Sequence, residues 1–304
     1  MEHPALLKMT ELAQIPEKLD STVSYLGEKL SFLKKNEKVL ICFAKDKPGC
    51  IGDLMEQAVL RCGAEPVVVS RDWRWKSILR LAFSNRVSTI IAPPLIVLGL
   101  TKLAKYKGTP LYIRNAVTAG YPCAEWMING FEVGLDCRTW GCFGARTGVV
   151  VSGFSCGQSL GVHLRDDVYG VDIVDENGSS LPDGEIGEMV LYPLEAPEYR
   201  YPMGERARIE RKPCSCGCAS PRLMEIQTGK ISDPALVDLS ARLMSWTSVL
   251  DCRLKKGSYG LEMEIVTFPG EKMPKFPSAA KMVVRPWDPE KDEPFFYVPG
   301  IENT

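Results

Sequence analysis

The 304-residue chain is nearly devoid of histidine and of net charge. It has two histidines, His3 and His163, and its 37 Lys and Arg almost balance its 38 Asp and Glu, which leaves a formal charge of −1. His3 lies at the chain end, so His163 is the one imidazole expected to serve a metal or acid–base site. The near-neutral charge argues against nucleic acid as the main partner.

Long apolar runs and targeting signals are also missing. The longest apolar candidate, residues 90–100, contains Pro93 and Pro94 and is too short to span a bilayer. The first residues, Met-Glu-His-Pro, lack the basic-then-apolar order of a secretory signal. Eleven cysteines, an odd number, indicate reduced thiols, some of them on a metal. We therefore expect a cytoplasmic protein with no membrane partner.

What is present indicates a large α/β protein. The chain is 45% hydrophobic and 25% charged, as is usual for globular domains. Helical spacing runs from Thr10 to Lys35, and beyond it buried strands such as 89–92 alternate with helices such as 94–106. Strands that alternate with helices of about ten residues predict parallel βαβ units up to about residue 135.

The pattern of predicted secondary structure changes after residue 136. Short strands separated by turn sequences at 175–178 and 182–184 predict an antiparallel, partly barrel-like region. A hairpin over 249–268 predicts a small C-terminal α+β domain, and the Pro- and acid-rich tail from Pro286 is expected to be an extended arm. We thus expect a large domain over 1–228, a hinge near Gly229, and a small domain over 229–304.

Four residues have the chemistry of a metal site. Cys156 and His163 lie seven residues apart, and Cys214 and Cys216 flank one residue in a Pro/Gly-rich loop. Three thiolates and an imidazole form a common tetrahedral shell for structural zinc, with Cys218 as a rival ligand. The spacing is not that of a zinc finger, so ordinary buried thiols beside a surface loop are the alternative.

A series of motifs over residues 172–217 resembles the adenylate-forming superfamily, most closely its phenylacetate–coenzyme A ligase branch. The order is Asp-Ile-Val-Asp175, Leu-Pro-Asp-Gly-Glu-Ile-Gly-Glu188, Arg-Tyr201, Gly-Glu205 and Pro-Cys-Ser-Cys-Gly217. Members of that branch can hold zinc at the Pro-Cys loop, with an upstream Cys and Gly-x-His that match Cys156 and His163. The resemblance therefore implies a zinc clip within an acyl-adenylating fold.

The resemblance also implies a reaction and its residues. Such enzymes join a carboxylic acid to ATP and then pass the acyl group to a thiol, usually coenzyme A. The adenine turn would be Ala119, Gly120, Tyr121 and Pro122, the aromatic motif that stacks on adenine would be Trp140-Gly141, and the ribose acceptor would be Glu205. Lys230 falls in the hinge motif, and Lys281 matches the C-terminal catalytic lysine.

Two departures from the family pattern concern phosphate chemistry. The Ser/Thr/Gly-rich phosphate loop that precedes the first helix in the family is not found, and Lys45–Gly52 is the only substitute in view. The plainer interpretation of that segment is a solvated strand-to-helix connection. The glutamate that helps to hold magnesium is replaced by Gly144. Both departures argue against Mg²⁺ and coenzyme A, whereas ATP or AMP stays in the expected set.

Two functional hypotheses follow. The first is a divergent ATP-dependent ligase that acts on a small carboxylic acid, favoured by Glu205 and by the hinge-like Gly229-Lys230. The second is a non-catalytic descendant that acts as a binding or assembly subunit, favoured by the two departures. In the second, a partner chain could supply the phosphate loop. The sequence leaves open the acid, the acyl acceptor, and whether the protein is a homo-oligomer or pairs with another subunit.

Overall fold

A computed structural model describes residues 3–70, 72–120, 123, 125–144, 150–157, 161–227, 234–257, 260–271 and 281–294. In these residues the helices are α1 (Pro4–Ala13), α2 (Pro16–Lys29), α3 (Ile51–Arg61), α4 (Trp75–Ser84), α5 (Pro94–Lys107), α6 (Glu125–Leu135) and α7 (Pro234–Ser245). The strands are β1 (Lys38–Ile41), β2 (Glu65–Val68), β3 (Thr89–Ala92), β4 (Asn115–Thr118), β5 (Arg138–Gly144), β6 (Val151–Phe154), β7 (Val162–Leu164), β8 (Tyr169–Val174), β9 (Gly187–Pro193), β10 (Tyr201–Glu210), β11 (Arg222–Gln227), β12 (Val249–Gly257), β13 (Gly260–Thr267) and β14 (Lys281–Pro286).

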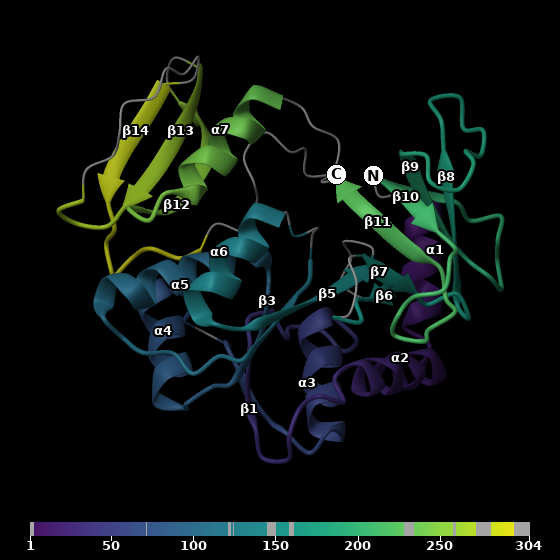
Figure 1. Ribbon diagram of the computed structural model, residues 1–304, viewed down its shortest axis with the longest axis horizontal. Coiled ribbons are helices and arrows are strands. Elements are labelled where there is room, and N and C mark those ends of the chain that lie inside the picture. Colours follow the sequence, from purple (N-terminus) through teal and green to yellow (C-terminus); the bar gives the residue numbers. More distant parts are fainter. Residues whose placement is uncertain are drawn as a thin grey trace.

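The strands form one long sheet and one small sheet (Figure 1). The long sheet has eleven strands in the order β2-β1-β3-β4-β5-β6-β7-β11-β10-β9-β8. Strands β1 to β5 pair in parallel, and from β5 to β6 onward the pairing is antiparallel. Strands β12, β13 and β14 form the small sheet beside α7. This arrangement confirms the expected α/β class with an antiparallel part and a small C-terminal α+β part.

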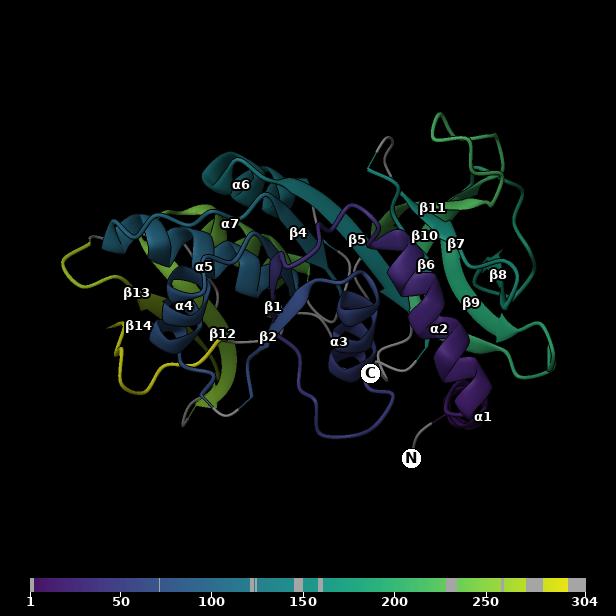
Figure 2. The ribbon, with the colours of Figure 1, turned by 90° about the horizontal axis from the view of Figure 1, so that it is seen from below.

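The parallel part of the sheet is covered on both faces, which explains its apolar strands. Leu40 packs into a core with α4, α5, α6 and the C-terminal elements, whereas Val39 and Ile41 pack with α2 and α3. Residues 94–104 of helix α5 are buried on all sides because the helix lies between the sheet and the C-terminal elements. Helix α1 packs against β9 and α2 against α3 (Figure 2).

The expected continuous helix from Thr10 to Lys35 is wrong. The chain forms two helices with a break at Ile15, and α2 begins at Pro16. Proline has no backbone N–H and its ring collides with the carbonyl four residues earlier, so it ends a preceding helix. At the first position of α2 the same residue is favourable, because its N–H would have no intrahelical partner there.

The expectation of an extended arm from Pro286 is also wrong for the described part of the tail. Trp287 is only 4% exposed. The guanidinium of Arg285 holds both carboxylate oxygens of Asp292 at 2.7 and 2.8 Å. The N–H of Trp75, the first residue of α4, donates to the Asp292 carbonyl at 3.1 Å. The segment 287–292 therefore folds back onto the large sheet's helical layer.

A buried lysine joins α5 to the C-terminal elements. Lys102 Nζ donates to the carbonyl oxygens of Met244 and, at 2.9 Å, of Val249. Burial lowers the pKa of Lys102 to about 8, and the nearby Cys252 and Asp251 oppose that shift. The lysine satisfies two carbonyls at the cost of placing an ammonium in a poorly solvated interface.

This burial predicts that stability rises with pH between about 8 and 10.4, the ordinary lysine pKa. In that window the unfolded chain binds the proton that the folded chain has released, so the free energy of unfolding increases with pH. The total gain is about 3 kcal/mol, which a Lys102→Met variant should lack. Urea titrations of both proteins at pH 7.5, 9 and 10.5 measure the difference. Parallel stability–pH curves for the two proteins would contradict the assignment.

Candidate functional site

The structure brings together the four residues that sequence analysis chose as metal ligands. Cys156 follows β6, His163 lies in β7, and Cys214 and Cys216 lie in the loop between β10 and β11. Strand β7 pairs with both β6 and β11, with His163 opposite Phe154 and Arg222. This pairing draws the loop after β10 toward β7. The four ligand atoms all lie within 4.8 Å of one another.

Two distances within this cluster match those of a tetrahedral zinc shell. Cys156 Sγ lies 3.7 Å from Cys214 Sγ, and Cys216 Sγ lies 3.4 Å from His163 Nε2. Zinc–sulfur bonds of ~2.3 Å and zinc–nitrogen bonds of ~2.0–2.1 Å, arranged tetrahedrally, place two sulfurs about 3.8 Å apart and a sulfur and a nitrogen about 3.5 Å apart. The donor set therefore fits zinc in chemistry and in spacing.

Hydrogen bonds around the cluster orient its ligands. His163 Nδ1–H donates to the Ser220 carbonyl at 3.1 Å, which leaves the Nε2 lone pair facing the thiols. Ser220 is itself held by its hydroxyl, which donates to Asp166 Oδ1 at 2.7 Å. Such a partner fixes both the tautomer and the direction of a ligating imidazole.

Cys218, the rival ligand, is not in the described cluster. Its backbone N–H donates to Cys216 Sγ at 3.4 Å, so it supports a ligand through its main chain. Gly217 has φ +85°, and its N–H donates to the Cys214 carbonyl at 3.0 Å. This turn presents the Cys218 amide to the cluster. With four protein ligands there is no open position, which is the arrangement of structural sites.

The expected nucleotide turn begins at the carboxyl edge of the parallel sheet. Ala119 and Gly120 directly follow β4, and the Ala119 N–H donates to the Ala92 carbonyl at 3.2 Å. Gly120 has φ +95°, a conformation that residues with a Cβ rarely adopt. Tyr121 and Pro122, the second half of the turn, lie outside the described residues, as does Lys230 of the hinge motif. Their roles stay predictions.

Trp140 does not have the surroundings expected for adenine stacking. Its side chain is 9% exposed, and its ring stacks on Phe32 with centroids 4.4 Å apart and planes 6° apart. Its Nε1–H donates to Asn115 Oδ1 at 3.3 Å, and a Cβ at Gly157 would lie only 2.8 Å from the ring. Phe32 thus covers one face of the indole ring, and the role of Trp140 in adenine stacking stays a prediction. The neighbouring Gly141 uses its N–H to bind Ser155 Oγ at 2.7 Å.

Glu205, the expected ribose acceptor, lies on β10 and is 3% exposed. Alternate residues of this strand point inward, because the burial follows the period of two of a β-strand. Glu205 is therefore one of the inward-facing residues of β10. The role of Glu205 as ribose acceptor stays a prediction.

Lys281, the expected catalytic lysine, begins β14 at one end of the small sheet. Its Nζ lies 2.5 Å from Glu262 Oε1 in an ion pair, and its side chain is otherwise exposed. The pair gives the lysine a structural partner on β13, the strand that β14 joins in parallel. The catalytic role stays a prediction.

The segment Lys45–Gly52, the substitute considered for a phosphate loop, has two of its groups engaged within the chain. Lys45 Nζ pairs with Glu56, and the Gly49 N–H donates to Asp53 Oδ2 at 2.8 Å. Cradling a phosphate requires free backbone N–H groups. Here Asp53, in the first turn of α3, accepts from the Gly49 amide, and Glu56, in the next turn, pairs with the lysine. Asp53 is a residue that sequence analysis missed; its place in the first turn of a helix was the available signal.

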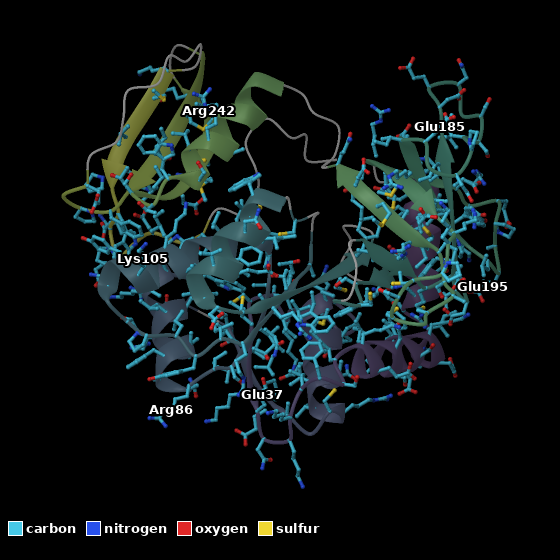
Figure 3. The ribbon with its side chains drawn as sticks, viewed as in Figure 1. Glu37, Arg86, Lys105, Glu185, Glu195 and Arg242 are labelled. Atoms are coloured by element: carbon cyan, nitrogen blue, oxygen red, sulfur yellow. The ribbon has the colours of Figure 1, made fainter. Side chains whose placement is uncertain are left out.

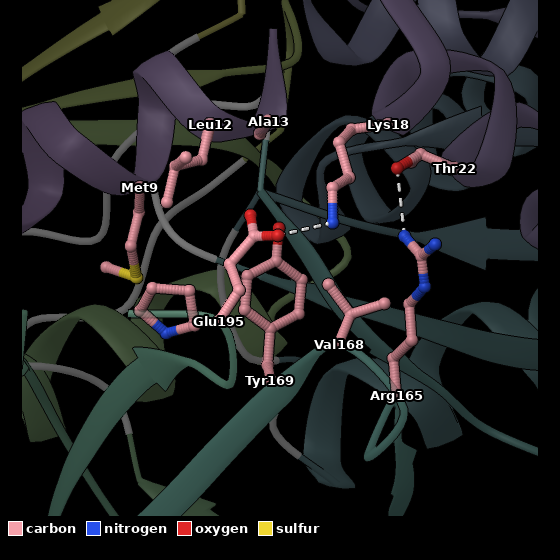
Figure 4. Close-up of a pocket in the computed structure, with 10 residues that line it drawn as sticks. Met9, Leu12, Ala13, Lys18, Thr22, Arg165, Val168, Tyr169 and Glu195 are labelled. Atoms are coloured by element: carbon pink, nitrogen blue, oxygen red, sulfur yellow. Dashed lines mark hydrogen bonds and ion pairs between the residues drawn. The ribbon is translucent and has the colours of Figure 1, made fainter. Parts of the chain in front are cut away.

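A small cavity lies between α1, α2 and β8 (Figure 4). Its volume is about 20 Å³, and Lys18–Glu195 (2.7 Å) and Arg165–Thr22 (2.8 Å) line it. That volume suffices for a water molecule and excludes an acyl adenylate.

Among the described helices, none is long and apolar enough to cross a membrane.

Comparison by sequence finds no protein-family model and no curated protein that matches the chain. Comparison by structure finds 2-hydroxyisobutyryl-CoA ligase in its postadenylation state with 2-HIB-AMP, at 13% identity and a TM-score of 0.69 over 95% of this chain and 70% of that one. The same ligase with 2-HIB-AMP and CoA in its thioesterification state matches at 12% identity and a TM-score of 0.64, over 94% and 69% of the two chains.

A benzoate CoA ligase from Burkholderia xenovorans LB400 matches at 13% identity and a TM-score of 0.54, over 84% of this chain and 56% of that one. These likenesses extend over the parallel sheet, the antiparallel strands and the C-terminal elements, because they cover most of the chain. At such low identity they establish architecture. The chain shares the fold of these CoA ligases.

Proposed function

We propose that the protein activates a small carboxylic acid with ATP, as an acyl-adenylate-forming ligase of the phenylacetate–coenzyme A ligase type. The observation that carries the proposal is the match of 95% of the chain to a ligase bound to an acyl-AMP. The nucleotide would lie beside Ala119 and Gly120, because open α/β sheets bind ligands outside the carboxyl ends of their strands.

The Cys₃His cluster supports the same branch. Cys156, His163, Cys214 and Cys216 would hold a structural zinc that ties β7 to the loop after β10. When bound, the metal supplies cross-linking of these segments and no reaction chemistry. The acyl acceptor is proposed to be a thiol, since the structural neighbour in its thioesterification state contains CoA.

A second candidate is a non-catalytic descendant of the fold that acts as a binding or assembly subunit. The packing of Trp140 on Phe32 and the burial of Glu205 favour it, because both side chains would have to move before they could contact a nucleotide. The second candidate shares the fold and the zinc cluster with the first. It differs in giving no acyl adenylate.

ATP–pyrophosphate exchange with a panel of small carboxylic acids separates the two candidates. The first predicts exchange at least tenfold above the acid-free background with one or more acids. A Lys281→Gln variant should lower that exchange roughly 100-fold, because the lost cation would stabilise developing charge. Lys291→Gln, which removes an exposed cation from the same part of the chain, is the matched control and should leave the rate unchanged. Absence of both exchange and calorimetric ATP binding would contradict the ligase and leave the second candidate.

A further inference from the structure

A groove rich in cations lies at the amino-terminal edge of the parallel sheet, opposite the proposed nucleotide site. Its volume is about 710 Å³. Glu37 and Arg86 mark this edge at the bottom of Figure 3. The groove is formed by the segment before β1, the segment between α4 and β3, and the segment before β4, and the residues that line it are Lys34, Lys35, Asn36, Glu37, Lys38, Ser84, Asn85, Arg86, Ser88, Tyr112 and Arg114.

The single carboxylate of the groove faces inward. Glu37 accepts hydrogen bonds from the Lys34 N–H (2.9 Å), the Ser88 hydroxyl (2.7 Å) and the Thr89 hydroxyl (2.8 Å). Burial by itself raises the pKa of Glu37, but these hydrogen bonds together lower it by more than burial raises it. The net shift of the Glu37 pKa is therefore downward. Glu37 is therefore an ionised hub that holds two of the three segments together.

The cations of the groove are poorly neutralised. Arg114 lies 3.7 Å from Glu37, and Lys38 lies 4.0 Å from Glu65 at the limit of an ion pair. For Lys34, Lys35 and Arg86, all exposed, no carboxylate within ion-pair distance is found in the described part of the chain. A chain with a net charge of −1 thus concentrates five cations against one carboxylate in one groove.

The backbone at Arg86 is unfavourable for the residue that occupies it. Arg86 follows the C-cap of α4 with φ +52°. The Val87 N–H donates to the Ala82 carbonyl and the Arg86 N–H to the Phe83 carbonyl, both at 3.0 Å. These two bonds form a Schellman motif, in which the left-handed position that Arg86 occupies is normally a glycine. A left-handed arginine costs stability, and such strain gathers at functional sites. The arrangement keeps a guanidinium in the groove where glycine would be more stable.

We propose that this groove binds a ligand through a di- or triphosphate group, at a site separate from the one that would activate the carboxylic acid. Its volume lies in the range of small-molecule sites. Guanidinium and ammonium groups are the usual partners of phosphate. The four-residue strands between the two edges set them roughly 13 Å apart. Tyr112, which is 54% exposed, offers a ring on which the base of a nucleotide can stack.

Calorimetric titration with inorganic tripolyphosphate at low salt tests the site. The Lys35→Gln/Arg86→Gln double variant should bind at least roughly tenfold more weakly than the wild type, because two charge-assisted contacts are lost. The Lys105→Gln/Lys291→Gln double variant removes the same charge from exposed positions outside the groove and should bind within about twofold of the wild type. Equal weakening by both double variants, or no saturable binding by the wild type, would overturn the proposal.

An Arg86→Gly variant separates binding from folding. It relieves the left-handed backbone, so its thermal midpoint should rise while its affinity for tripolyphosphate falls. An unchanged affinity would count against the groove.

A titration with a second ligand, ADP, determines whether the phosphate group belongs to a nucleotide or to an inorganic polyphosphate. If the ligand is a nucleotide, Tyr112→Ala should weaken the binding of ADP but not that of tripolyphosphate. If the ligand is an inorganic polyphosphate, the variant should bind both compounds as the wild type does. Either result supports a phosphate site in the groove. Pyrophosphate exchange should persist in the groove variants, so a failure of this proposal is distinguishable from a failure of the proposed ligase activity.

Discussion

A Cys214→Ser variant is expected to lose its zinc and to unfold at a markedly lower temperature than the wild type. Cys214 is buried, and its sulfur lies 3.7 Å from that of Cys156. A metal that binds only the folded chain stabilises it by about 4 kcal/mol when the free metal concentration is 1,000 times its dissociation constant. Loss of one of four ligands removes most of that contribution.

The measurements are metal content by emission spectroscopy and unfolding by circular dichroism. The wild type should carry about one equivalent of zinc, as a closed four-ligand site implies. Cys218→Ser is the matched control, because Cys218 shares the loop but contributes its backbone N–H. It should keep the metal and stay within about 0.5 kcal/mol of the wild type. Loss of zinc from Cys218→Ser but not from Cys214→Ser would reverse the ligand assignment.

A Trp287→Ala variant is expected to lose about 3–5 kcal/mol of unfolding free energy, the usual cost of truncating a buried tryptophan. The Trp287 ring meets Phe268 edge-on at 6.4 Å, and Phe268 stacks on Tyr106 of α5 at 4.3 Å. Lys107 Nζ lies 5.1 Å from the centre of the Trp287 ring. These contacts connect the end of β14, through β13, to α5, so their loss should also loosen the C-terminal elements.

Urea denaturation gives the free energy, and hydrogen exchange at α5 and β13 reports the loosening. Trp246→Ala is the control with the same chemistry, because Trp246 is 37% exposed and lies in the segment between α7 and β12. It should cost less than about 1 kcal/mol. Equal losses in the two variants would show that the tail does not hold the C-terminal elements in place.

The spacing of apolar residues predicted helices and strands correctly where a single helical or strand period was clear. The apolar run Thr89–Ala92 is β3, and the apolar stretch that follows is helix α5. Strand β5 escaped prediction because its two glycines, Gly141 and Gly144, weaken the strand signal. The sequence prediction missed the break between the two helices at Ile15, although Pro16 is a residue that ends helices. The helical spacing of apolar residues continued on both sides of the proline.

The metal cluster could be predicted because its ligands are rare and chemically specific. The choice between Cys216 and Cys218 could not, since it depends on the turn at Gly217, which presents one thiol and one amide to the same point. The adenine and ribose positions came from motif order alone. Motif order carries no information on whether a side chain is covered, as Trp140 and Glu205 are.

The sequence by itself determined the period of each strong element, the apolar core and the soft ligands of the cluster, because these depend on residue type and short-range spacing. Only the tertiary structure decided that Phe32 covers Trp140, that Asp292 returns to α4, and that segments around residues 37, 86 and 114 share one basic groove. Each of these joins residues far apart in the chain. The proximity of the groove segments follows from the order of β1, β3 and β4, which is settled by burial and pairing over the whole sheet.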